Sequence, residues 1–551
     1  MSSVMKMAIC LALASCCCMG GAGVAYGEEA APPVEEQATV PVQEEAPGPA
    51  QEQTPAPVEK EIALSLHDVV RKALEANLDI AVERYNPDIR DAELLSAQGE
   101  FDPTITIDYS YSEEEVPQTT REGLASGAGT TDTLTKDLSL TLGGKLMSGT
   151  EYEAFFDREQ SQFTQKDTFI DPDPLVLGDE FIGDVRNPSE YNLDLTFSLT
   201  QPLLKDFGYD ANLADIRIAR TQKGMSIEDF RKRVMDVIAE AQSAYWDLVA
   251  TIENLRVTER SLEVAQDLLE ENRIRLEVGT MAQLEVLQAE TGVAQREEEV
   301  IVSRALIKDA EDNLKRILNL PKDTEEWKTR IVPTDQPVIV ETEADLLSLL
   351  EAALEKRPDY KRSLMQIETD AINERFARNQ LLPSVDLTGE YQFRAVNSEL
   401  HSAFDDIERG TSPSWLLGVT AEYPIGNRTA KGDYSKARLE KMQSVKEAEN
   451  LRLAIIVDVK RAVRGIETSL KLIEATRKGA ELARESLSAE RKKLEVGVTT
   501  SHDVLEFESE LTDAERREIV ANIGYRKALI NLAVAVGTIL EENNIVIEEA
   551  L

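Results

Sequence analysis

Residues 276 to 290 read LEVGTMAQLEVLQAE, and residues 494 to 508 read LEVGVTTSHDVLEFE. The second stretch begins 218 residues after the first (494 minus 276), and the two align without a gap. A glycine at the end of a helix lets the chain reverse in a left-handed conformation without a steric cost at Cβ, and a Ser or Thr just after it can cap the next helix. We therefore predict that Gly279 and Gly497 lie at the tips of two helical hairpins.

The segments around these glycines have the hydrophobic spacing of long coiled-coil helices. From Val234 to Leu276, apolar or small residues recur in steps of three and four that keep a seven-residue period. The helical tract from about residue 206 to residue 278 would span roughly 110 Å at 1.5 Å per residue, which is too long for a compact globule. The predicted helices of the two hairpins run over about residues 206–278, 281–319, 428–496 and 501–536.

Short segments outside the hairpins alternate apolar and polar residues as strands do. In TITIDYSY (104 to 111), Ile and Tyr occupy one face, and Thr, Asp and Ser occupy the other. The same alternation occurs in NLDLTFSLTQP (192 to 202), SVDLTGEYQF (384 to 393) and LGVTAEYP (417 to 424). Aromatic-rich strands of this kind fit a membrane barrel with one lipid face and one polar face. An ordinary half-exposed sheet has the same alternation, so both interpretations stay open.

The chain contains two internal repeats of one plan. ALEANLD (73 to 79) matches ALEKRPD (353 to 359), and at the same offset of 280 residues Pro103 matches Pro383. Each half thus begins with a helix, breaks at a proline and enters a strand. The predicted organisation is a signal segment (1–27), a disordered tether (28–61), a first repeat (62–321), a connector (322–345), a second repeat (346–540) and a tail (541–551).

The first repeat is longer than the second between its two strands. Pro202 matches Pro424 at an offset of 222, so the first half carries 58 more residues there (280 minus 222). This surplus contains two alternating pieces, at 137 to 146 and at 150 to 156, and the acidic stretch DPDPLVLGDE. We predict an added hairpin and a long external loop.

Composition excludes several classes of function. The formal net charge of −42 leaves no basic stripe to replace phosphate counterions, so we predict no nucleic-acid partner. All 4 cysteines lie within residues 1–18, so the body of the chain has no disulfide and no thiolate site. His67, His401 and His502 lie far apart in sequence, without a metal-binding or nucleophile motif. We predict no enzyme activity, no cofactor and no metal.

The N-terminus fits two kinds of export signal. The apolar run MAICLALAS and the small residues up to AYG (25 to 27) fit a secretory signal cleaved before Glu28. The stretch LASC instead resembles a lipobox, in which Cys16 would be lipidated and become the new N-terminus. Either signal takes the chain out of the cytoplasm. The tether that follows is rich in Pro, Glu and Gln and cannot pack a core.

Taken together, these motifs resemble the TolC family of outer-membrane channel proteins over about residues 62 to 540. The resemblance rests on the two ALE…D openings, the two strand-entry prolines, TQPL at 200 to 203, and the two VG…(D/E)VL…E tips. It implies an α+β membrane protein, in which a long antiparallel α-helical coiled-coil barrel is continuous with an outer-membrane β-barrel. A trimer would build both barrels, with four strands from each copy. The 58-residue surplus departs from that pattern and leaves the strand count open.

The resemblance also implies roles for residues at the tips. In that family the tips dock on a periplasmic adaptor, and an acidic ring surrounds the periplasmic entrance. The docking residues are then Gly279, Thr280, Gly497 and Thr499. The gate residues are then Asp503, Glu506 and, in the first repeat, Glu285. A trimer would gather these carboxylates around a narrow axis, where a cation is held favourably. The same carboxylates are also explained as solvated residues at the acidic start of a helix.

Two functions of different classes remain open. The first is a passive exit duct of a tripartite efflux or type I secretion system, built as a homotrimer in outer-membrane lipid and joined to a periplasmic adaptor and an inner-membrane pump. Four strands cannot close a pore alone, because even small closed barrels need about eight. The second is a periplasmic or surface coiled-coil scaffold without a pore, which the alternating strands and the duplicated halves disfavour.

Overall fold

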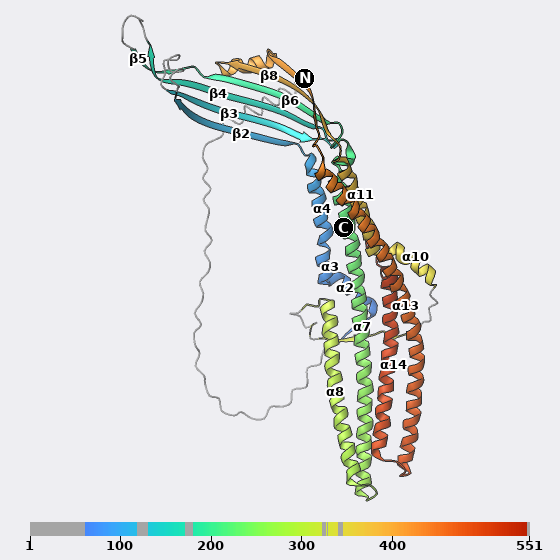
Figure 1. Ribbon diagram of the computed structural model, residues 1–551. Coiled ribbons are helices and arrows are strands. Elements are labelled where there is room, and N and C mark those ends of the chain that lie inside the picture. The colour runs from blue at the N-terminus through green and yellow to red at the C-terminus, as the bar shows by residue number, and fades with distance from the viewer. Residues whose placement is uncertain are drawn as a thin grey trace, which may run out of the picture. The chain divides into compact units, whose positions relative to one another are not determined.

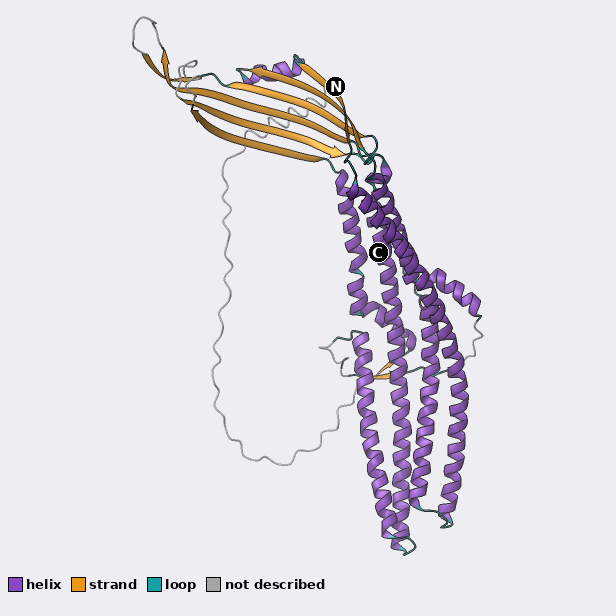
Figure 2. Cartoon of the chain, in the orientation of Figure 1, coloured by secondary structure: helices purple, strands orange, loops and turns teal. Residues whose placement is uncertain are grey.

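The computed structural model describes residues 61–117, 130–170, 180–321, 327, 329–339 and 345–547. The predicted signal segment, nearly all of the tether and the acidic stretch at 171–179 lie outside the described residues. Figures 1 and 2 show that the described chain consists of long helices and one large sheet.

Four long helices form two antiparallel hairpins. The first consists of α7 (Ala214–Glu277) and α8 (Gln283–Ile317), and the second of α13 (Arg428–Glu495) and α14 (Ser501–Val536). Because α7 also packs along α14, the hairpins lie side by side with their tips at the same end (Figure 2). The predicted bounds agree to within a few residues, except at the start of α7. There the chain first forms the short helix α6 (Tyr209–Asn212).

Shorter helices pack along the hairpins. Helices α2, α3 and α4 lie against α7, while α11 packs against both α7 and α13. Ser65 begins α2 with a capping box, and Pro358 occupies the first turn of α11, where its missing N–H costs nothing. These helices are α2 (Leu66–Ala76), α3 (Leu78–Glu83), α4 (Tyr85–Gln98), the 3-10 turn η1 (Gly99–Phe101), α10 (Leu346–Lys356), α11 (Pro358–Asn379) and α15 (Ile539–Glu542).

A small parallel sheet ties the start of the described chain to the predicted connector. Its strands are β1 (Glu61–Leu64) and β7 (Arg330–Pro333). The sequence did not indicate either strand, because four residues are too few to show an alternating pattern.

The large sheet has seven strands among the described residues. Six follow one antiparallel path in the order β2-β3-β4-β6-β8-β9, and β5 pairs with β4 beside it. The predicted extra hairpin of the first half is present as β3 and β4, inserted between β2 and β6. The strands are β2 (Thr104–Pro117), β3 (Thr130–Lys145), β4 (Glu151–Ile170), β5 (Glu180–Arg186), β6 (Glu190–Pro202), β8 (Ser384–Asn397) and β9 (Pro413–Glu422).

A helix that the sequence did not indicate covers part of this sheet. It is α12 (Leu400–Arg409), which lies between β8 and β9 in the chain and packs on β6 and β8. Ala403 of this helix is fully buried against Leu193, and Phe404 stacks on Phe156 with ring centroids 6.2 Å apart. Its apolar side therefore continues the apolar face of the sheet.

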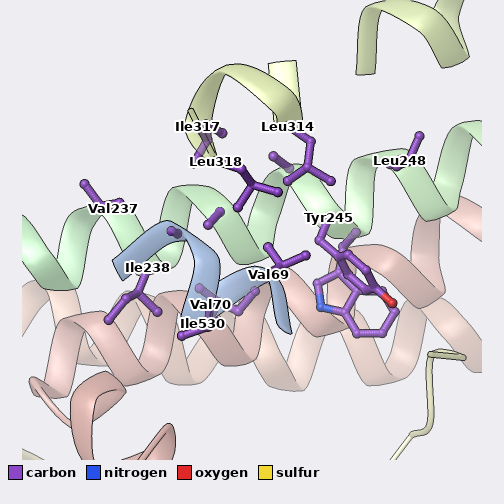
Figure 3. Packing of buried hydrophobic residues seen from close by; sticks show 14 of the residues in the cluster. Val69, Val70, Val237, Ile238, Tyr245, Leu248, Leu314, Ile317, Leu318 and Ile530 are labelled. Atoms are coloured by element: carbon purple, nitrogen blue, oxygen red, sulfur yellow. The ribbon is translucent and has the colours of Figure 1, made fainter. Parts of the chain in front are cut away.

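The main core lies where α2, α7, α8 and α14 meet (Figure 3). Tyr245 and Leu248 of α7 are fully buried there, in one cluster with aliphatic side chains from α7 itself and from the other three helices. The aliphatic partners labelled in Figure 3 are Val69, Val70, Val237, Ile238, Leu314, Ile317, Leu318 and Ile530. Burying a side chain of this size stabilises the fold by about 1.5–3 kcal/mol.

Among the described residues, α14 is the one helix long and apolar enough by composition to cross a membrane. Its apolar residues pack against α7, α10 and α13 instead. Two cations interrupt the apolar run and both find partners on α7. The Lys527 Nζ lies 2.6 Å from a carboxylate oxygen of Asp247, and Arg526 lies over the Trp246 ring. We therefore interpret α14 as a core helix of the hairpins.

Candidate functional site

Both hairpin tips reverse through the same turn. Gly279 has φ 79° and Gly497 has φ 75°, in the left-handed region that side chains avoid. At each tip the glycine amide donates to the carbonyl three residues back, and the next amide donates to the carbonyl five residues back, at 2.9–3.1 Å. These paired bonds are a Schellman motif. A Cβ at either glycine would meet nothing within 4 Å, so the backbone conformation alone requires glycine.

The returning helices begin differently at the two tips. Thr500 caps α14 with a capping box, since its side chain accepts from the Asp503 amide and the Asp503 carboxylate accepts from the Thr500 amide. Helix α8 has Ala282 as its N-cap residue and therefore no side-chain cap. The expectation that a Thr or Ser caps each returning helix is therefore wrong for the first tip. The Thr280 hydroxyl instead donates back to the Arg275 carbonyl of α7 at 3.0 Å.

Polar side chains join the first hairpin to the second at the tips. The Asn272 amide of α7 and the Ser501 hydroxyl of α14 exchange hydrogen bonds of 2.9 and 3.1 Å, and both residues are fully buried. The Ser501 amide also donates to a Glu285 carboxylate oxygen at 3.1 Å. Glu285 thus satisfies an otherwise unpaired N–H in the first turn of α14. The tips are one unit rather than two separate turns.

The structure places the predicted gate residues in different environments. Asp503 accepts bonds from Thr500 and from the Thr499 hydroxyl, and these bonds hold the pKa of the Asp503 carboxyl at about 2. Glu285 is half-buried against α14, as described above. Glu506 is exposed and takes no part in these contacts. Two of the three carboxylates therefore hold the tip together, and their role in a gate stays a prediction.

A layer of buried polar groups connects the hairpins farther from the tips. The Arg296 guanidinium of α8 donates to the Ser261 hydroxyl of α7 at 3.1 Å, and both side chains are buried. Arg516 of α14 lies 2.7 Å from Glu299 of α8 and also donates to Thr258 of α7 at 3.2 Å. The two bonds of Arg516 cross from one hairpin to the other, whereas the bond between Arg296 and Ser261 joins the two helices of the first hairpin.

Glu508 is a buried carboxylate in the same layer. It is 4% exposed, and the nearest cation is the Arg491 guanidinium, 3.7 Å from its Oε2 atom. That oxygen has no hydrogen-bond partner in the described part of the chain. Burial raises the pKa of the Glu508 carboxyl, and the positive charges of Arg491 and Arg296 only partly oppose the effect.

These polar residues were not predicted from the sequence, although three of them carry a recognisable signal. Thr258, Ser261 and Asn272 of α7 are almost fully buried among the apolar positions of the coiled-coil seam. A polar residue in such a seam commonly specifies register or partner rather than stability. Glu508 has no comparable signal, because a glutamate on a long charged helix is usually solvated.

The large sheet presents two chemically different faces. Cross-strand pairing places Ile107 beside Leu140, and the same apolar face continues through β4, β6, β8 and β9. Several side chains on this face are largely exposed: Ile105 is 69% exposed, Trp415 75% and Leu417 69%. An exposed apolar surface of this extent marks contact with lipid or with another protein.

The opposite face of the sheet is polar and strongly acidic. It carries Asp108 of β2, Asp137 of β3, Asp157 of β4 and Asp194 of β6, with Asp157 directly opposite Asp194. Arg394 of β8 donates to the Asp194 carboxylate at 2.8 Å. A face of this kind is compatible with water rather than with a packed core.

The described residues contain no group of three or more His, Cys, Asp or Glu side chains arranged to hold a metal ion. His67, His401 and His502 are all exposed and lie on three different helices, α2, α12 and α14. The structure does not bring them together.

A sheet with one open apolar face, continuous in the chain with long helical hairpins, is the fold of solved outer-membrane channels. The Campylobacter jejuni CmeC outer membrane channel is similar with a TM-score of 0.59 and 16% identity, over 86% of this chain and 85% of that chain. The outer membrane protein VceC from Vibrio cholerae is similar with a TM-score of 0.60 and 15% identity, over 86% of this chain and 96% of that chain.

The chain belongs to the outer membrane efflux protein family, whose model matches residues 69–320 and 349–538. Outer membrane protein TolC of Escherichia coli (strain K12) is 22% identical over 346 residues, which are 60% of this chain and 67% of that protein. Outer membrane efflux protein BepC of Brucella suis biovar 1 (strain 1330) is 25% identical over 348 residues, which are 61% of this chain and 71% of that protein. The resemblance to the TolC family is thus confirmed, and the chain is an outer-membrane efflux channel protein. Members of this family are channels rather than enzymes.

Proposed function

We propose that three copies of the chain form the exit duct of a tripartite efflux or type I secretion system. The sheets close a β-barrel in the outer membrane, and the hairpins of the two repeats form a helical tunnel in the periplasm. Substrates pass through passively from an inner-membrane pump and its periplasmic adaptor to the exterior. No residue of the duct performs chemistry.

The observation that carries this proposal is a sheet with an open apolar face and two open edges. β2 and β9 are the edges, and each pairs with a single described strand. In lipid, unpaired backbone groups cost several kcal/mol each, so a spanning sheet has to close on itself. Six strands are fewer than the eight or so of the smallest closed barrels. Joining copies edge to edge satisfies the backbone and places the acidic face toward a water-filled lumen.

The tips are proposed to carry the contacts with the rest of the system. Their placement at one end of both hairpins supports docking on the adaptor through Gly279, Thr280, Gly497 and Thr499. In a trimer, Asp503, Glu506 and Glu285 would surround the axis of the tunnel at its periplasmic entrance. The exposed Glu506 is then the carboxylate most available to a passing cation.

A matched pair of lysine variants on β2 tests the membrane barrel. Ile107 lies on the apolar face and its neighbour Thr106 lies on the polar face. A lysine on a lipid-facing position costs about 2–4 kcal/mol near the bilayer midplane, whereas a lumen position tolerates it. Ile107→Lys should therefore abolish single-channel conductance in planar bilayers and lower the yield of membrane-inserted protein. Thr106→Lys should conduct.

Equal behaviour of the two lysine variants would argue against a lipid-facing sheet. A wild-type protein that is soluble without detergent and never conducts would support the scaffold alternative instead.

A further inference from the structure

The inserted hairpin β3–β4 is part of the sheet wall, since β3 pairs with all of β2 and β4 pairs with β6 from Glu151 to Ser161. Pairing between β2 and β3 begins with Thr104 opposite Gly143, where β2 leaves the helices, and continues to Pro117 opposite Thr130. Pairing between β4 and β6 likewise begins with Glu151 opposite Thr200, where β6 returns toward the helices. The two inserted strands thus start at the same rim as the original ones.

The turn between β3 and β4 is anchored at that rim. The Gly208 amide, just after β6, donates to the Ser148 carbonyl at 3.0 Å. Thr150 donates to Gln201 of β6, and Lys145 forms an ion pair of 2.6 Å with Glu100 of η1. A hairpin that only decorated the outer loops would make none of these contacts.

A glycine in this turn shows how closely the turn fits. Gly149 has φ 91°, and a Cβ on it would collide with the Asp206 carbonyl oxygen and lie 2.7 Å from the Asn212 amide nitrogen. The turn is therefore packed against the segment that enters α7.

The inserted strands also have the two faces that a membrane wall requires. Leu138, Leu140 and Leu142 of β3 lie on the same face as Ile105 and Ile107 of β2 through their cross-strand pairs. On β4, Ala154 and Phe156 continue this face, and Glu153 and Asp157 lie on the other. Outside the membrane, nothing would require the apolar and polar faces of the hairpin to match those of the neighbouring strands.

We propose that three copies of this chain close a barrel of eighteen strands, six from each copy, with β9 of one copy pairing antiparallel with β2 of the next. The inference rests on the proposed trimeric channel and corrects the twelve strands that the family resemblance implies. The insertion lies between β2 and β6 in the sheet, so the two edges that meet another copy are unchanged. Barrel diameter grows roughly linearly with strand number, so this barrel is about 1.5 times as wide as one of twelve strands.

The consequence is a wide, water-filled exit. Barrels of 16–18 strands leave an aqueous channel, whereas barrels of about eight are filled by side chains. Two added strands per copy also add Asp137 and Asp157 to the acidic face, three times around the wall. The outer end of the duct is then not its constriction, and control of passage falls to the helical end.

A deletion that removes only the insertion tests the strand number. Deleting Thr130–Asn187 removes β3, β4 and β5 and is equal in length to the 58-residue surplus (187 minus 130, plus one). β2 can then pair with β6, because β2 and β4 run in the same direction and present the same alternation. Native mass spectrometry gives the copy number, and electron cryo-microscopy of axial views gives the barrel diameter. We expect three copies in both proteins and a wild-type barrel about 1.5 times as wide as that of the deletion variant.

Cysteine cross-linking of the full-length chain decides the matter if the deletion variant does not fold. The sequence from residue 28 onward has no cysteine, and replacing Cys17 and Cys18 with serine removes the thiols that processing at Cys16 would leave, so the added thiols are unambiguous. Val419→Cys on β9 is combined in turn with Ile105→Cys, Ile107→Cys and Tyr109→Cys on β2. These three positions allow the register between β9 of one copy and β2 of the next to shift by two residues in either direction. Oxidation should join copies into a covalent trimer through one of these pairs. The control, Val419→Cys with Leu140→Cys on the interior strand β3, should stay monomeric in denaturing gels.

Equal diameters for the two proteins, or a cross-link through Leu140→Cys in place of the β2 positions, would overturn the eighteen-strand barrel. A copy number other than three would overturn the proposed trimer as well, and native mass spectrometry would report that result directly.

Discussion

At the scale of single residues, the tips depend on two backbone conformations and on a few buried polar atoms. The two glycines could be placed from sequence because a helix that must reverse needs a residue that tolerates positive φ. The partners of Asn272, Ser501 and Glu285 could not be placed, because they come from segments 216 or more residues apart. Only the packing of α7 against α14 brings them together.

Gly279→Val and Gly497→Val should impair coupling to the pump without preventing assembly. A valine in the left-handed region costs about 1–2 kcal/mol, and this strain falls on a turn that is exposed and remote from the main core. We expect reduced export of a pump substrate in cells with normal trimer yield. Gly479→Val is the matched control, since Gly479 lies within α13 and a Cβ there meets nothing within 4 Å. Undiminished export by both tip variants would contradict the docking role.

Glu508→Gln should stabilise the protein at neutral pH. Burial raises the pKa of the Glu508 carboxyl, so the fold favours its protonated form and its ionisation at pH 7 costs stability. The amide removes that cost. The gain should shrink as pH falls and vanish below the ordinary value of 4.5, where the carboxyl is protonated in the folded and the unfolded chain alike. Thermal unfolding followed by circular dichroism at pH 7 and at pH 4 measures this difference. The exposed Glu506→Gln should leave the melting temperature unchanged at both.

At the scale of elements, the long helices were predictable and the short connections were not. A seven-residue period over α7 is a strong signal because it repeats many times. β1, β7 and α12 gave no such signal, and they are held in place by contacts with segments far away in the sequence. Tyr245 of α7 shows how such contacts work.

Tyr245 joins α7 to the predicted connector and, through it, to the start of the first repeat. Its hydroxyl donates to Asp335, beyond β7, at 2.8 Å, and the Asp335 amide donates back to it at 3.1 Å. The same Asp335 carboxylate accepts from the Leu66 amide at the start of α2. Burial raises the pKa of the Tyr245 hydroxyl to about 12, so it stays a donor at any ordinary pH.

Tyr245→Phe should loosen the β1–β7 sheet while keeping the hairpins. Loss of the hydroxyl leaves buried polar groups without a partner, which costs about 1–3 kcal/mol. We expect faster hydrogen exchange and proteolysis around residues 61–66 and 330–335. Tyr85→Phe is the control, because Tyr85 is 66% exposed and its loss of a hydroxyl should have no effect there. If Tyr245→Phe protects these residues from hydrogen exchange and proteolysis as well as wild type does, the hydroxyl does not hold the β1–β7 sheet to α7.

At the scale of the whole molecule, the carboxylates of one chain acquire a new role when three chains surround one axis. Three copies would bring together the charges of Glu506 and Asp503, where like charges repel and multivalent cations bind. The two residues differ, because Asp503 is held by hydrogen bonds within its own tip and Glu506 is free in the described chain.

Trivalent cations added from the periplasmic side should block conductance, and Glu506→Gln should relieve the block more than Asp503→Asn does. The amide variants remove charge but keep the shape of each side chain, so the Thr500 cap is retained. Bilayer recordings across a cation titration measure the blocking concentration. Blocking concentrations that do not change in the double variant would rule out an acidic ring at these positions.

The sequence alone determined the long helices, the reversal at two glycines, the alternating strands and the insertion of a hairpin. Each of these rests on a local preference that repeats along the chain, either a seven-residue period, a two-residue alternation or a positive φ. The tertiary structure decided where the insertion lies in the sheet and which polar side chains cross between the hairpins. Those outcomes depend on contacts between segments far apart in the chain, such as Asn272 with Ser501 and the β3–β4 turn with Gly208. A local pattern does not encode them, because many pairings satisfy it and only packing selects one.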